Sequence, residues 1–113
     1  MEAKRSLALD HFIAIVLDPE REDAHKRLSD KSYWGDTGYW VVVAIGYIEG
    51  AIHRVPFTPT TDVSVWLEGV IEEITHAQER FRREEEDPDG YGSATFNGAL
   101  GRVYGVLDAH REG

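Results

Sequence analysis

Residues 62–86 constrain the fold more than any other stretch, because apolar side chains recur there at steps of three and four. This spacing places them on one face of an α-helix and leaves charged side chains on the other. Thr61 or Asp62 can cap the start of the helix, and Pro88 and Gly90 end it. The apolar face comprises Val63, Trp66, Leu67, Val70, Ile71, Ile74, Ala77 and Phe81. The sequence therefore predicts a long helix with one buried face.

A second helix is predicted over residues 93–110, where apolar side chains again share one face. These side chains are Phe96, Leu100, Val103 and Leu107. Each glycine inside a helix costs about 0.5–1 kcal/mol relative to alanine, so a row of them needs a reason. The small residues of this stretch are Ala94, Gly98, Gly101 and Gly105. They predict a seam where another backbone packs closely against the helix.

Residues 39–48 are rich in Val, Ile and aromatic side chains and are apolar at both odd and even positions. This composition favours a central strand that is covered on both faces. Glu49-Gly50 predicts a turn into a shorter strand over residues 51–57. Residues 10–17 suit either a strand or a helix, of which the strand is preferred.

Asp18-Pro19-Glu20 is typical of a helix start, with aspartate as the cap and proline in the first turn. It predicts a short polar helix that ends near Leu28. Together these elements predict an α+β fold, in which a small antiparallel sheet of about three strands is packed by two long C-terminal helices and one short helix. The length of 113 residues and the apolar share of 42% suit one compact domain spanning residues 1–113.

The chain is acidic, with 21 Asp and Glu residues against 12 Lys and Arg residues and a formal net charge of −9. This balance disfavours nucleic acid, because affinity for phosphate backbones comes mainly from Lys and Arg. It disfavours anionic membranes for the same reason. A basic protein surface is the partner that such a field attracts.

The chain has no cysteine, which excludes disulfides, thiolate zinc sites and cysteine nucleophiles. Its first residues lack the pattern of a signal peptide, because Asp10 and His11 interrupt the apolar stretch. The apolar runs at residues 12–17 and 39–45 are too short to cross a bilayer as helices. We therefore expect a cytoplasmic protein.

Two kinds of metal motif occur in incomplete form. Residues 22–25 and 73–76 have the Glu-x-x-His spacing of di-iron bundles, but no inward-facing glutamates from other helices complete it. Residues 87–90 hold carboxylates beside a glycine, as calcium loops do. The EF-hand spacing fails, because Tyr91 and Gly98 stand where ligands belong. No metal is predicted.

Catalytic and nucleotide motifs are also missing. Residues 90–93, Gly-Tyr-Gly-Ser, open the last predicted helix but lack the preceding strand and the lysine of a phosphate-binding loop. No Gly-x-Ser-x-Gly motif occurs. We predict no cofactor and no catalytic residue.

The most unusual segment is residues 33–40, where four large aromatic residues surround two glycines. Such rings either fill a core, form a protein interface or hold a small ligand. We predict partner binding by these aromatics together with the acidic stretch that follows the long helix. The predicted partner-binding residues are Tyr33, Trp34, Asp36, Tyr39, Glu84, Glu85, Glu86, Asp87 and Asp89.

These features favour a non-enzymatic interaction domain that occludes a basic surface of a partner protein. Immunity proteins, antitoxins and phage inhibitors of host defence are analogous in size and charge, although not in sequence. A homodimer is a further option. The alternative is a small enzyme or ligand-binding domain with a pocket between sheet and helices, in which His53, Tyr91 or Asp108 supplies polar groups.

Overall fold

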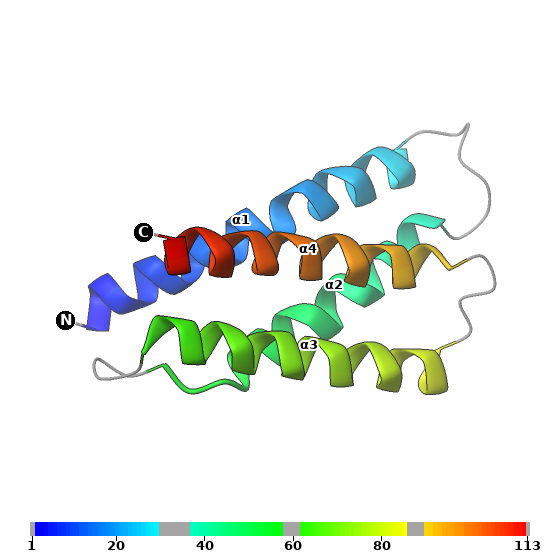
Figure 1. The fold of residues 1–113 in the computed structure, drawn as a ribbon. Coiled ribbons are helices and arrows are strands. Elements are labelled where there is room, and N and C mark those ends of the chain that lie inside the picture. The colour runs from blue at the N-terminus through cyan, green and yellow to red at the C-terminus, as the bar shows by residue number, and fades with distance from the viewer. Residues whose placement is uncertain (1, 30–36, 58–61, 86–89, 113) are drawn as a thin grey trace.

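The computed structural model describes residues 2–29, 37–57, 62–85 and 90–112, and these fold into four helices (Figure 1). The helices are α1 (Glu2–Ser29), α2 (Thr37–His53), α3 (Val63–Glu84) and α4 (Tyr91–Glu112). None of the described residues forms a strand. The predicted α+β fold with an antiparallel sheet is therefore wrong, and the protein is all-helical over this part of the chain.

Successive helices run in opposite directions, so two ends of the bundle can be distinguished (Figure 1). At the proximal end, α1 and α3 begin while α2 and α4 end. At the distal end, α1 and α3 end while α2 and α4 begin. Helices α2 and α4 each pack against all three other helices, whereas α1 and α3 meet through side chains, including the rings of Phe12 and Trp66.

One hydrophobic core draws on all four helices. Its largest fully buried side chains, Phe81 and Phe96, have ring centroids 5.3 Å apart. Tyr47 packs edge-on against both rings, and Trp40 packs edge-on against Phe81. These aromatic contacts join α2, α3 and α4. No described helix combines the length and apolarity needed to cross a membrane.

Helix α2 replaces the predicted hairpin. Its buried residues recur at helical steps of three and four and comprise Val41, Ala44, Ile45, Ile48, Ala51 and Ile52. The intervening residues are also largely apolar, and some of them, such as Tyr39 and Val42, are exposed. A helix that is apolar on most sides has the same composition as a buried strand. Glu49 and Gly50 lie inside α2, so the predicted turn and the strand over residues 51–57 are wrong as well.

Helix α1 replaces the predicted strand over residues 10–17 and the predicted short helix after it. Pro19 lies inside this helix instead of opening a new one. Proline has no backbone N–H, so the helix lacks the usual donor to the carbonyl of Ile15. In the same turn, the carbonyl of Val16 accepts a hydrogen bond from Arg102 Nη1 of α4 at 3.2 Å. A side chain from another helix thus adds a donor where α1 is weakened.

The prediction of a long helix after residue 62 is confirmed by α3. The Asp62 side chain caps its start by accepting hydrogen bonds from the backbone N–H groups of Ser64 and Val65, at 2.8 and 3.4 Å. Most of the predicted apolar face is buried, although Ile71 is only partly buried and Val63 is 36% exposed. The second predicted helix is confirmed by α4, whose Phe96, Val103 and Leu107 are buried.

The predicted glycine seam on α4 is wrong at two of its positions. A Cβ atom added at Gly101 or Gly105 would meet nothing within 4 Å, so no backbone packs there. At Gly98 an added Cβ would lie 2.5 Å from Glu20 Oε1 of α1. Only Gly98 therefore accommodates a neighbour, and that neighbour is a carboxylate rather than a backbone.

Candidate protein-binding surface

The described members of the predicted binding set lie towards the distal end. Tyr39 is in the first turn of α2 and is 52% exposed. Glu84 is the last residue of α3, and Glu85 follows it. The beginning of α2 and the end of α3 lie at the same end of the bundle (Figure 1). The other predicted residues, Tyr33, Trp34, Asp36, Glu86, Asp87 and Asp89, lie outside the described residues.

Apolar side chains reach the surface beside Tyr39. Val42, three residues further along α2 and thus on the same helix face, is 46% exposed. Leu28, near the end of α1, is 65% exposed and packs over Gly38, where an added Cβ would lie 2.8 Å from Leu28 Cγ. Leu28, Tyr39 and Val42 therefore form an exposed apolar strip across α1 and α2, which we call the distal strip.

Sequence reasoning missed two residues of the distal strip. Val42 fell within a strand that was expected to be covered on both faces, and Leu28 was expected only to end a short polar helix. Both expectations depended on wrong elements. The spacing of Val42 could have indicated its place in the strip. It is three residues from Tyr39, and if this stretch is a helix the two side chains lie on the same face.

The acidic end of α3 is linked to α2 through Tyr47. The Tyr47 hydroxyl donates hydrogen bonds to Glu84 Oε2 at 2.8 Å and to Glu85 Oε1 at 3.3 Å. Burial and these two carboxylates raise the pKa of Tyr47 from 10.0 to about 12. The Arg80 guanidinium lies 5.4 Å from the centre of the Tyr47 ring. The two carboxylates are thus held in place without being neutralised by the hydroxyl.

A shallow open depression of about 450 Å³ adjoins this contact between α2 and α3. It is lined by Val43, Gly46, Tyr47, Arg54, Arg80 and Glu84. Cationic, anionic and apolar groups alternate in it, and it is too open to exclude water.

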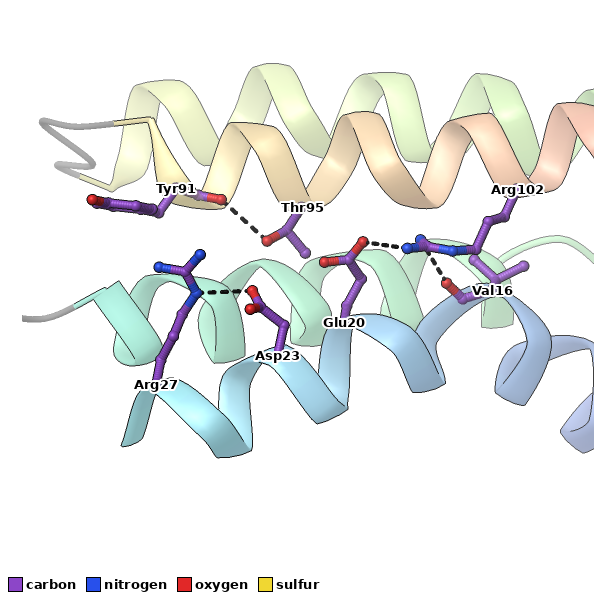
Figure 2. A network of polar contacts seen from close by, with 7 residues as sticks. All are labelled: Val16, Glu20, Asp23, Arg27, Tyr91, Thr95 and Arg102. Carbon is purple, nitrogen blue, oxygen red and sulfur yellow. Dashed lines mark hydrogen bonds and ion pairs between the residues drawn. The ribbon is translucent and has the colours of Figure 1, made fainter. Parts of the chain in front are cut away.

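A polar network holds the second half of α1 against α4 (Figure 2). Glu20 Oε1 pairs with Arg102 Nη2 at 2.7 Å, and Arg102 also donates to the Val16 carbonyl. Closer to the distal end, Asp23 pairs with Arg27 at 2.8 Å, and the Arg27 guanidinium lies 5.0 Å from the centre of the Tyr91 ring. Each carboxylate in this network faces an arginine. The network therefore positions α1, including the turn that carries Leu28.

The residues proposed for the alternative enzyme do not converge on one site. His53 is exposed at the end of α2. Tyr91 begins α4 and Asp108 lies near its end, so their separation of 17 positions corresponds to about 25 Å along the helix. Among the described residues, no group of three or more His, Asp or Glu side chains is placed to hold a metal ion. The suggested calcium loop over residues 87–89 lies outside the described residues.

Comparisons with known proteins return no match: no family model, no curated protein and no solved structure resembles the chain.

Proposed function

We propose that the protein is a cytoplasmic, non-enzymatic binding module that covers a basic surface of a partner protein with its distal end. The observation that carries this proposal is the placement of the distal strip at the same end of the bundle as Glu84 and Glu85. An inhibitor of the immunity-protein or antitoxin kind would act in this way, by occluding a surface that its partner needs.

The two parts of this surface support different steps of binding. Exposed tyrosine and aliphatic side chains lose contact with water when a partner covers them, and such anchors dominate the free energy of binding. The negative field, set by the net charge of −9, accelerates encounter with a basic partner. The distal strip should therefore control the dissociation rate, and the carboxylates should control the association rate.

The test is affinity capture from the native host, compared between the wild-type protein and two variants. Tyr39→Ala removes an anchor of the distal strip, whereas Val65→Ala removes a side chain that is 62% exposed near the proximal end. We expect one basic protein to be captured by the wild type and by Val65→Ala, and at least about tenfold less by Tyr39→Ala. Circular dichroism establishes that both variants remain folded.

Kinetic measurements with the purified partner then test the role of charge. Association should slow as salt rises, and the pair Glu84→Lys and Glu85→Lys should slow it further than the control pair Glu72→Lys and Asp108→Lys. The proposal fails if Tyr39→Ala captures the same proteins as the wild type. It also fails if the captured partner is acidic, or if the protein captures only a second copy of itself.

A further inference from the structure

A second feature of the molecule lies at the opposite end from the proposed binding surface. A partly open cavity of about 210 Å³ lies between the proximal parts of the helices. Among the described residues, the side chains that line it are all apolar, and they come from α1, α3, α4 and the segment after α2. They include Leu9, Phe12, Phe57, Val63, Trp66 and Val106.

Trp66 forms the fixed wall of this cavity. Its ring lies 5.0 Å from the Phe12 ring and 5.2 Å from the Phe57 ring, measured between centroids, and each neighbour is inclined to it by about 60–70°. Its indole Nε1–H donates to the backbone carbonyl of Val55 at 3.1 Å. Because this donor is already engaged, the tryptophan presents only its apolar ring to the cavity.

The segment after α2 is packed closely enough to support this wall. A Cβ atom added at Gly69 would lie 3.2 Å from Val55 Cγ1, which is tighter than ordinary contact. The glycine thus lets Val55 approach α3, and Val55 in turn holds the indole of Trp66. The position of the ring is therefore set by packing on one side and by a hydrogen bond on another.

Size and chemistry together limit what this cavity can hold. An apolar cavity of about 150 Å³ stays dry and binds benzene, whereas pockets for drug-sized ligands begin at about 300 Å³. The volume of about 210 Å³ falls between these values and suits a single ring with short alkyl substituents. A charged ligand is disfavoured, because none of the described lining side chains could replace the water that it loses.

We propose that this cavity binds a small uncharged aromatic molecule. Aromatic character follows from the three rings of Phe12, Phe57 and Trp66, whose faces and edges offer the edge-to-face contacts that aromatic pairs prefer. An aliphatic molecule of the same volume gains the burial of its surface but not these contacts.

Toluene is a suitable probe, and the indole N–H signals of the three tryptophans provide the readout by NMR. Trp34→Phe and Trp40→Phe variants assign the signals. We expect toluene to shift the Trp66 signal in a saturable manner while the Trp34 and Trp40 signals stay in place. Toluene should also raise the melting temperature, because it binds only the folded state. Benzoate, which carries a charge on the same ring, should do neither, and methylcyclohexane should bind several-fold more weakly than toluene.

Variants locate the binding site. Val106→Phe and Val63→Phe each place a ring in the cavity, from α4 and from α3, and should weaken toluene binding at least tenfold. Val63 is already 36% exposed, so its replacement tests the site even if Val106→Phe does not fold. The matched control is Val65→Phe, which adds the same ring to the same helix at a residue that is 62% exposed and outside the cavity. It should bind toluene as the wild type does.

The proposal is overturned if toluene leaves the Trp66 signal unchanged in the folded wild-type protein. It is also overturned if a folded Val63→Phe or Val106→Phe variant keeps the wild-type affinity. Equal binding of methylcyclohexane and toluene would contradict the aromatic preference.

Discussion

Gly98 and Gly101 lie one turn apart on α4 but have different surroundings. Gly98 faces Glu20 Oε1, and Gly101 faces open space. Gly101→Ala should raise the free energy of unfolding by about 0.5–1 kcal/mol, because alanine loses less backbone entropy in a helix. Gly98→Ala should lower it, because the new methyl group displaces a carboxylate that is held by Arg102. Urea denaturation measures the change in the free energy of unfolding for each variant. A stabilised Gly98→Ala variant would contradict the contact with Glu20.

The ionisation of the Tyr47 hydroxyl is a second property of a single residue that can be measured. Its pKa is raised to about 12 in the folded protein by burial and by Glu84 and Glu85. The neutral phenol is therefore favoured on folding, and its contribution to stability is complete below pH 10 and is lost as the pH rises through 12. Absorbance at 295 nm should show that Tyr47 ionises late. Tyr47→Phe should remove this late step, and Tyr104→Phe should leave it. A native titration without a late step would contradict the hydrogen bonds to the carboxylates.

The pair formed by Glu20 and Arg102 links two elements, α1 and α4. The Glu20 side chain is only 13% exposed, so Arg102→Met leaves a largely buried carboxylate without its partner. We expect a loss of about 1–3 kcal/mol in the free energy of unfolding. The double variant with Glu20→Met should recover part of this loss. Arg21→Met is the control, because the pairs of Arg21 with Asp18 and Glu49 are exposed and should contribute at most about 1 kcal/mol. Equal losses for the two arginine variants would show that burial of Glu20 has no effect.

The buried face of α3 allows two isoleucines of one helix to be compared. Ile74 is fully buried, whereas Ile71 is only partly buried. Ile74→Ala should cost about 2–5 kcal/mol, and Ile71→Ala should cost less, because part of its surface is already in contact with water. Thermal and urea denaturation measure both. A larger loss at Ile71 would mean that Ile71, rather than Ile74, faces the core.

At the scale of elements, the sequence predicts those helices that have one polar face. Helices α3 and α4 alternate between core and solvent, and the cap at Asp62 adds a specific start signal. Helix α2 is apolar on most sides, including exposed positions such as Tyr39 and Val42, so its composition did not distinguish helix from strand. The prediction divided α1 in two because proline is common in the first turn of a helix. Pro19 instead lies inside α1. The errors in α2 and in residues 10–17 of α1 together turned an all-helical protein into an α+β prediction.

The sequence predicted some residues of the candidate surface but not their arrangement in space. Tyr39, Glu84 and Glu85 belong to the predicted set because aromatic and acidic composition can be read without knowing the fold. That the beginning of α2 and the end of α3 share one end of the bundle follows from the antiparallel order of the helices, which requires the fold to be known (Figure 1). The cavity beside Trp66 could not be predicted at all, because its walls come from residues as far apart in sequence as Leu9 and Val106.

At the scale of the whole molecule, the helices differ in how many neighbours protect them. Helix α2 contacts α1, α3 and α4, and its Ala44, Ile48 and Ala51 have no exposed surface. The second half of α1, after Pro19, contacts α4 through the polar network of Glu20 and Asp23. This half of α1 also packs against α2, through Leu28 over Gly38 and through the pair of Arg21 with Glu49. Of its residues only Ala24 belongs to the buried core, so separating it from the bundle exposes less apolar surface than separating α2 and requires less free energy.

Native-state hydrogen exchange should follow this order. Backbone amides in the middle of α2 should exchange slowest, through global unfolding only. Amides of α1 after Pro19 should exchange faster than those before it, because the lost hydrogen bond and the polar contacts allow this half to open by itself. Arg102→Met should increase the exchange rate in the second half of α1 by more than in α2, since it removes the contact with Glu20 and with the Val16 carbonyl. Uniform protection along α1, or acceleration spread equally over all helices in Arg102→Met, would show that the bundle opens only as a unit.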